Sequence, residues 1–552
     1  MASSQKKKQK SGDFLIQGAI LASAGMITRI IGIAYRVPLT YIVGDEGMGF
    51  YGYAFEVYSI ALLLSSYSLP LAVSKLVSAR MAKGEKRNAI RVFLCALVFA
   101  CAVGLLISLI IGFGAGGIST YLMSAPFSRY ALRVLAPGLF IVAIMGVIRG
   151  YFQGMGTMLP TAVSQIIEQI VNAIVSLMAA SYLLKVGTVI AKARKNDLYG
   201  PAYAAAGGTL GTVVGAFGGL IFLVFVLACY RKTMKRQLRP DPIHEDESYE
   251  TIVKIMLFTI APVILSTAIY NISQVLDQLL FSHIMAAQGY AESKYVALLG
   301  IFTGKYNTLI NVPLAMANAL GASVIPSLTA AVSVGDREQI HKKIQLTIRF
   351  AMLVAIPSFM GYVVIASPIM QLLYGDARKT PAYMLTIGAI TVVFYCLSTV
   401  SNAILQGLNR MTTPVKNAAM SLGIHIVALL IMMIFLKWNI YAIVVANIIF
   451  SLSMCILNAR AIYQACGYRQ EYEQTFIRPF LASAIMGIVT LLVHKLFDLI
   501  IGGRIATILA ILIAITVYAV SVLKLKVLTE AEIRSMPKGT TILNLCKKAH
   551  LL

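Results

Sequence analysis

Two copies of one short motif decide the fold, Gln153-Gly-Met-Gly-Thr-Met-Leu-Pro160 and Gln406-Gly-Leu-Asn-Arg-Met-Thr-Thr-Pro414. Each copy joins the end of one long apolar block to the start of the next. A second pair, Pro70-Leu-Ala72 and Pro313-Leu-Ala315, repeats at a similar distance, so the spacing runs from 243 to 254 residues. Both copies follow an even number of apolar blocks. We therefore predict two repeats of the same orientation, an arrangement typical of some transporters.

Long apolar blocks continue from about residue 14 to about residue 526. Of the 552 residues, 59% are hydrophobic and 12% are charged, whereas a soluble domain carries roughly 25% charged residues. A helix needs about 20 such residues to cross the hydrocarbon core, so the blocks predict about fourteen spans. We expect an all-α polytopic membrane protein. The approximate span cores are 14–42, 50–78, 89–112, 130–152, 160–184, 201–230, 252–284, 300–331, 344–366, 382–407, 414–436, 440–464, 475–497 and 504–525.

The repeat predicts two six-helix lobes in a parallel pseudo-twofold arrangement, followed by two C-terminal helices. Loop cations such as Arg80, Arg231 and Arg460 fall mainly on one side, which fits both termini in the cytosol of a bacterial inner membrane. The loop at 192–195 is also cationic but would lie on the opposite side, so it does not fit this orientation. The expected parts are a basic cytosolic N-terminus (1–13), the first lobe (14–230), a cytosolic linker (231–250), the second lobe (251–465), the last two helices (466–526) and a cytosolic tail (527–552).

Several function classes are disfavoured by what the sequence lacks. The net charge is +25, but the cations sit in short loops between apolar blocks, so topology explains them better than nucleic-acid binding. The seven cysteines are scattered, and no spacing typical of a metal site occurs. There is no phosphate-binding loop for ATP hydrolysis, and no catalytic set stands out. We expect a transporter, with no cofactor and no resident metal, rather than an enzyme.

Polar residues inside the spans are the candidate functional residues. A charge near the centre of a transmembrane helix costs at least about 2.5–3.5 kcal/mol, so it usually faces a bundle interior or a wet cavity. Arg29 and Arg36 lie seven residues apart, on one face of the first helix. The fifth and seventh helices each carry one polar stripe. The remaining candidates are Glu56, Gln165, Glu168, Gln169, Asn172, Asn271, Gln274, Asp277, Gln278, Lys305 and Asn311.

Plainer interpretations of these residues stay open. Amide stripes often bond neighbouring helices without contacting a ligand. Arg36 could extend to the outer interface. Glu168 and Asp277 could be internal partners of the arginines rather than ion ligands.

Four motifs carry a family resemblance: Thr28-Arg-Ile-Ile-Gly-Ile-Ala-Tyr-Arg-Val-Pro-Leu39, Gly44-Asp-Glu-Gly47, Arg149-Gly-Tyr-Phe-Gln-Gly154 and Pro160-Thr-Ala-Val-Ser-Gln-Ile-Ile-Glu-Gln169. Together they resemble the MurJ-type and stage V sporulation protein B (YtgP-like) branch of the multidrug/oligosaccharidyl-lipid/polysaccharide exporter superfamily. The resemblance covers nearly the whole chain.

This resemblance implies a flippase that moves lipid II, the undecaprenyl-pyrophosphate-linked peptidoglycan precursor, to the outer leaflet by alternating access. It implies that Arg29 and Arg36 bind the pyrophosphate, with Lys305 the nearest candidate for a further cation. The implied partners are the lipid-linked glycan, the bilayer and cell-wall synthesis proteins. Coupling to the membrane potential or to a monovalent cation stays open. The alternatives are a flippase for another undecaprenyl-linked polysaccharide or a spore-cortex precursor, and a cation-coupled multidrug exporter.

Overall fold

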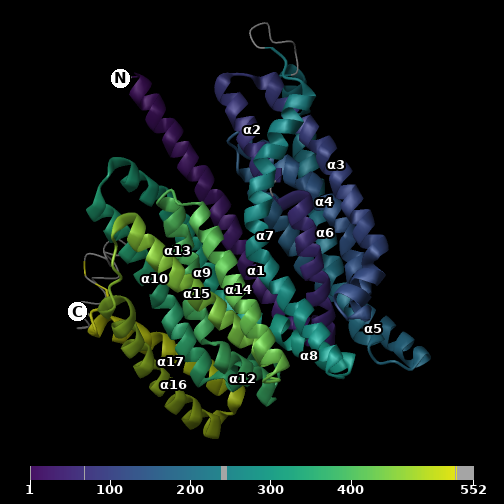
Figure 1. Cartoon of the computed structure of the whole chain (residues 1–552), viewed down its shortest axis with the longest axis vertical. Coiled ribbons are helices and arrows are strands. Elements are labelled where there is room, and N and C mark those ends of the chain that lie inside the picture. Colours follow the sequence, from purple (N-terminus) through teal and green to yellow (C-terminus); the bar gives the residue numbers. More distant parts are fainter. Residues whose placement is uncertain (1, 68, 238–244, 529, 531–552) are drawn as a thin grey trace. The chain divides into compact units, whose positions relative to one another are not determined.

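Long helices make up nearly all of the described chain in a computed structural model of the protein (Figure 1). The structure describes residues 2–67, 69–237, 245–528 and 530, without the side chains of residues 2–19, 22, 64, 67 and 261–271. No β-strand occurs in this part of the chain, so the predicted all-α class is confirmed. The helices are α1 (Ala2–Leu62), α2 (Leu69–Lys83), α3 (Lys86–Gly117), α4 (Arg129–Gly154), α5 (Leu159–Arg194), α6 (Tyr199–Gln237), α7 (Tyr249–Ala287), α8 (Glu292–Gly300), α9 (Asn307–Val334), α10 (Arg337–Val364), α11 (Ala366–Tyr374), α12 (Lys379–Gly388), α13 (Ile390–Gly407), α14 (Thr412–Ile434), α15 (Ile440–Cys466), α16 (Arg478–Ile501) and α17 (Gly503–Lys524).

The helices cluster into two compact units, Met1–Gly304 and Lys305–Leu552. The first unit contains α1 to α8, and its apolar core includes Phe93 of α3 and Ile148 of α4. The second unit contains α9 to α17, with Ala482 and Val522 in a small core of their own. The division by packing falls later in the chain than the linker at 231–250. The two repeat-based lobes therefore stay a prediction.

The predicted count of fourteen spans is not confirmed. Twelve helices in the described part of the chain are long and apolar enough to cross a membrane. The first two predicted spans appear as one, Ser23–Leu62, broken at Gly44 with φ 74° and ψ 175°. Its 40 residues measure about 60 Å, which is twice the hydrocarbon thickness. The seventh predicted span corresponds to α7, part of whose side chains are not described and which is not among the twelve.

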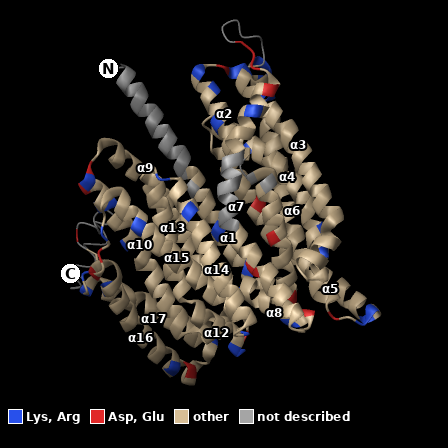
Figure 2. Cartoon of the chain, in the orientation of Figure 1, with Lys and Arg blue, Asp and Glu red and all other residues tan. Residues whose placement is uncertain are grey.

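Two further predicted spans differ in whether the structure forms them as one helix. The fourth predicted span, 130–152, is one helix, α4. The tenth, 382–407, is divided at Ala389 into α12 and α13. A short helix, α11, separates it from α10. Lys, Arg, Asp and Glu residues concentrate toward helix ends and connecting turns, as Figure 2 shows, and most of the length of the helices carries none of these four residue types.

Close backbone contact joins the second arm of α1 to α8 in the first unit. A Cβ atom added to Gly300 would lie 1.7 Å from the carbonyl oxygen of Asp45, and one added to Gly49 would lie 2.1 Å from that of Val296. These distances are far below van der Waals contact, so only glycine fits at either position. Small residues at such a crossing let helix backbones pack directly inside a membrane.

Candidate functional site

Arg36 lies at the centre of a polar cluster in the first unit. Its guanidinium carbon is 5.3 Å from the centre of the Tyr51 ring, within the range of a cation–π interaction. The neighbouring Tyr35 hydroxyl accepts a hydrogen bond from Asn172 Nδ2 at 3.3 Å. The cluster therefore joins both arms of α1 to the polar stripe of α5. The half-buried Arg36 is turned toward aromatic and polar groups of the unit.

Acidic side chains from α1 and α7 stand near this arginine. The charges of Asp277 and Arg36 both act on the half-buried Glu56. Tyr53, one turn before Glu56, shares a 2.6 Å hydrogen bond with Ser282 of α7, which fixes α7 against the second arm of α1. A cation and two carboxylates thus interact among long apolar helices. Charges inside a membrane protein usually face a bundle interior or a wet cavity, so this composition suits binding of a charged group.

The polar residues of α5 fall into two groups: some bond neighbouring helices together, and others lie close to α1. Asn172 accepts a bond from Ser176 at 2.9 Å, and Ser176 also donates to the carbonyl of Gly208 on α6. This is the helix-to-helix bonding that the plainer interpretation expects. Gln165 and Gln169 are half-buried, and the amide of Gln169 lies close to Gly32 of α1.

Glu168 on the same stripe forms an ion pair with Arg149 of α4. Arg149 Nη2 lies 2.8 Å from Glu168 Oε2, and Arg149 Nε donates to Ser164 Oγ at 3.0 Å. Arg149 was not among the candidate site residues. The sequence carried one usable signal, since the two charges flank the tight turn at 155–158 on adjoining helices. This pair supports the interpretation of Glu168 as an internal partner of an arginine.

The remaining candidates of the first unit differ in exposure. Asp277 and Gln278 of α7 are buried, and Gln278 Oε1 has no hydrogen-bond partner among the described residues. Gln274 is exposed. The side chain of Asn271 lies outside the described residues. Arg29 is exposed, so the two predicted arginines of α1 differ in their surroundings.

Lys305 belongs to the second unit and is held in an ion pair. It lies in a π-helical turn, Ile301–Tyr306, and its Nζ atom is 2.6 Å from Asp376 Oδ2. Arg378 also binds Asp376, through Nε at 2.9 Å and Nη2 at 2.6 Å. Burial raises the pKa of Asp376, but its bonds to Arg378 and Lys305 outweigh this effect and hold the pKa well below its usual range. The residues after α10 that form this site were not anticipated from the sequence.

The last candidate, Asn311, is exposed on α9. Among the described residues, no group of three or more His, Cys, Asp or Glu side chains is arranged to hold a metal ion.

An apolar groove of about 310 Å³ lies in the second unit. Its lining carries almost no polar surface, so it suits a hydrocarbon chain better than a sugar or a phosphate. The lining residues come from α10, α13, the π-helical turn Glu473–Ile477 and the start of α16, and they are Ile356, Phe359, Ile390, Val393, Phe476, Ile477, Phe480 and Leu481.

Comparison with known proteins decides the family. Residues 15–332 match the family described as polysaccharide biosynthesis protein. The chain belongs to this family. It is 28% identical to the lipid II flippase MurJ of Bacillus subtilis (strain 168), over 76% of each chain. It is 27% identical to stage V sporulation protein B of the same organism, over 73% of this chain and 75% of that one.

A solved structure of a family relative confirms the fold. The lipid II flippase MurJ in an inward closed conformation matches with a TM-score of 0.63 at 14% identity, covering 91% of this chain and 98% of that chain. The predicted resemblance to the MurJ and stage V sporulation protein B group is confirmed by these matches. The related flippase moves a substrate rather than transforming it, which supports the expectation of a membrane transporter rather than an enzyme.

Proposed function

We propose that this protein is a flippase for a lipid-linked oligosaccharide, and that lipid II is its substrate. The observation that carries the proposal is Arg36, a half-buried guanidinium that lies over the Tyr51 ring and interacts with Glu56. Guanidinium groups bind phosphate oxygens two at a time, which suits a pyrophosphate. The family and the relation to a lipid II flippase support the same substrate class.

The apolar groove of the second unit supports a substrate that carries a lipid. A pyrophosphate cannot cross hydrocarbon unaided, whereas an isoprenoid chain is apolar and dissolves in the hydrocarbon core. A groove lined by three phenylalanines and five aliphatic residues gives the chain a protein surface to follow. The proposal therefore assigns the headgroup to the polar cluster around Arg36 and the lipid chain to an apolar surface.

A flippase for another undecaprenyl-linked glycan or for a spore-cortex precursor is the second candidate. The observation that favours it is the near equality of the two identities, 28% to MurJ and 27% to stage V sporulation protein B.

The test is complementation in a bacterium depleted of its essential lipid II flippase, at matched membrane expression. We expect the wild type to restore growth, Arg36→Ala and Arg29→Ala to fail, and the matching lysine variants to retain part of the activity. Arg231→Ala, which removes an exposed cation at the end of α6, is the matched control and should behave as wild type. A well-expressed wild type that does not restore growth would refute lipid II as substrate and favour the second candidate. Growth with Arg36→Ala at the wild-type rate would refute the headgroup site.

We also propose that the membrane potential helps to drive the cycle. A cationic site that moves within the membrane field gains about 2.3 kcal/mol per charge per 100 mV. Transport in proteoliposomes should therefore be faster with an inside-negative potential than without one. Equal rates at both settings would contradict the coupling.

A further inference from the structure

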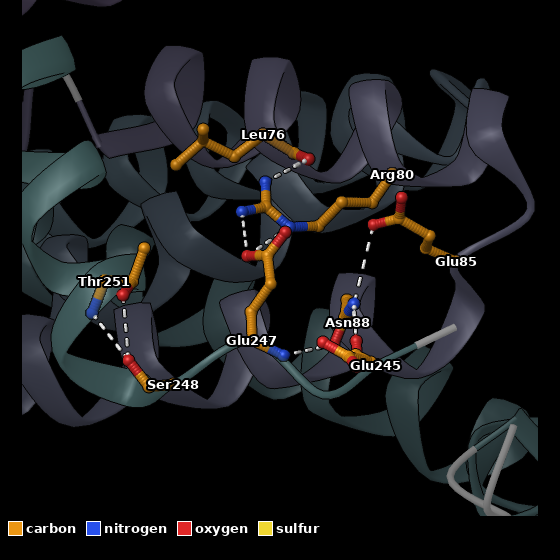
Figure 3. Close-up of polar contacts among 8 residues, drawn as sticks. All are labelled: Leu76, Arg80, Glu85, Asn88, Glu245, Glu247, Ser248 and Thr251. Atoms are coloured by element: carbon orange, nitrogen blue, oxygen red, sulfur yellow. Dashed lines mark hydrogen bonds and ion pairs between the residues drawn. The ribbon is translucent and has the colours of Figure 1, made fainter.

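Three consecutive acidic residues, Glu245–Glu247, hold the segment before α7 against the turn between α2 and α3 (Figure 3). Arg80 of α2 donates from Nε to Glu247 Oε2 at 3.1 Å, and its Nη2 atom pairs with the same oxygen. The third nitrogen, Nη1, donates to the carbonyl of Leu76 at 3.0 Å. Arg80 is only 6% exposed, so Glu247 neutralises a buried cation.

The backbone of the same segment is bound by one amide side chain. Asn88 of α3 donates from Nδ2 to the carbonyl of Glu245 at 3.0 Å and accepts from the backbone N–H of Glu247 at 3.2 Å. Figure 3 shows Asn88 between Glu85 and the segment, and Glu247 reaching from the segment to Arg80. Because both bonds use main-chain groups two residues apart, they fix the segment in one register.

The middle carboxylate, Asp246, binds two further cations of α3. Its Oδ2 atom lies 2.9 Å from Arg87 Nη2 and 3.1 Å from Arg91 Nη1. The Arg91 guanidinium carbon is in turn 4.4 Å from the centre of the Tyr249 ring, at the first position of α7. Three arginines of α2 and α3 therefore contact Asp246, Glu247 and Tyr249, at and just before the start of α7.

These contacts determine where α7 begins and which surface it covers. Ser248 caps the helix by accepting from the backbone N–H of Thr251 at 3.2 Å. One turn further on, Ile252 and Met256 are 0% exposed and belong to the apolar core that includes Leu76 of α2. The acidic segment thus ties the first turns of α7 to α2 and α3.

We propose that Glu245–Glu247 is an ionic latch that keeps the start of α7 on α2 and α3 and releases it when the latch opens. The acidic side chains of Asp246 and Glu247 remain accessible to water, so dissolved ions can screen the latch. The sequence repeat assigns α7 to the second half of the chain, and the latch binds it to the first half. Alternating access requires such halves to move relative to one another. The latch does not depend on which substrate is carried.

The test reads the latch through a residue that α7 covers. Ile252→Cys is introduced into a chain with Cys229→Ser and Cys546→Ser, and the protein is placed in lipid nanodiscs. The rate of labelling by a charged maleimide reports how often the start of α7 leaves its site. Charge-assisted bonds are strong enough that Glu247→Gln should raise this rate roughly tenfold or more. Glu250→Gln, an exposed carboxylate in the first turn of α7, is the matched control and should label as the parent does.

Two further measurements complete the design. The charge swap Arg80→Glu with Glu247→Arg should return the labelling rate toward that of the parent, because the pair is restored with opposite sign. Labelling of the parent should rise between low and high salt. A parental rate in Glu247→Gln, or a rate in the parent that does not respond to salt, would overturn the latch. Since labelling requires no substrate, these outcomes are independent of whether complementation succeeds.

Discussion

Replacing Asp376 by asparagine measures how much stability the second unit loses when the carboxylate beside its buried lysine is removed. Lys305 is 5% exposed and Asp376 is 7% exposed, and their charged atoms lie 2.6 Å apart. Asparagine keeps the size of the side chain and removes its charge. Taking one partner from a buried ion pair typically costs about 3–5 kcal/mol, because the other charge stays in the interior. We expect Asp376→Asn to lower the free energy of unfolding by this amount.

The opposite replacement should cost less. In Lys305→Met, Asp376 keeps two hydrogen bonds from the Arg378 side chain, so the loss is that of one charge-assisted bond, about 1.5–3 kcal/mol. The double variant Lys305→Met with Asp376→Asn removes both buried charges. It should therefore be more stable than Asp376→Asn alone, which is the non-additivity expected for residues in contact.

Thermal unfolding of the detergent-solubilised protein, followed by size exclusion, measures this order. Lys379→Gln is the matched control, because Lys379 is an exposed cation near Asp376 in the chain and exposed charges contribute about 0–1 kcal/mol. Additive losses in the double variant would refute the reasoning. If the double variant is stable but does not transport, Lys305 acts on the substrate and not only in packing.

The pair of Lys305 and Asp376 also predicts how the stability of the fold decreases at acidic pH. The folded-state pKa of Asp376 is held below its usual range by Arg378 and Lys305, against the effect of burial. Its contribution to stability is therefore complete above the unfolded-state pKa of about 3.9, and it is lost as the pH falls below that value through the folded-state pKa. We expect the wild type to lose more stability than Asp376→Asn between pH 5 and the acid limit, roughly pH 3. Parallel curves for the two proteins would contradict this.

Two further predictions concern the first unit. Gly300→Val should prevent folding, because even a Cβ atom would lie 1.7 Å from the carbonyl of Asp45, whereas Gly361→Ala has no atom within 4 Å and should fold normally; the yield of monodisperse protein measures both. Arg149→Met should destabilise more than Arg149→Met combined with Glu168→Gln, because the single change leaves a carboxylate without its 2.8 Å partner. Equal melting temperatures for the two Arg149 variants would contradict this, because they would mean that water solvates the Glu168 carboxylate once Arg149 is gone.

The sequence predicts the helical architecture well, for physical reasons. Apolar blocks of about 20 residues have no other way to satisfy their backbone in lipid, so the all-α class follows directly. The sequence predicts kinks and divisions within the helices less well. The kink at Gly44 requires φ 74°, and a single glycine in an apolar block does not distinguish a turn from a packing contact. The division of 382–407 at Ala389 follows Gly388, the last residue of α12, but one glycine in an apolar block does not by itself predict a break.

The candidate site was predicted by residue type more reliably than by partner. An intramembrane charge is visible in a sequence because it is costly, which is why Arg36, Glu168 and Lys305 stand out. Their partners are set by how helices far apart in the chain pack together. Asp376 lies 71 residues after Lys305 in a segment that looks like an ordinary loop, and nothing in its composition points to a buried ion pair.

The pairing of these charges bears on how an anion would be bound. Arg149 and Lys305 are each neutralised by a carboxylate within 3 Å, so a phosphate could reach either only by displacing that carboxylate. Arg36 lies over the face of Tyr51 and interacts with Glu56 at longer range. A ring face stabilises a cation without occupying the edge of the guanidinium that forms paired bonds to phosphate. Of these three cations, Arg36 is therefore the one whose surroundings favour phosphate binding without displacement of a closely paired carboxylate, and its replacement should affect transport more than stability.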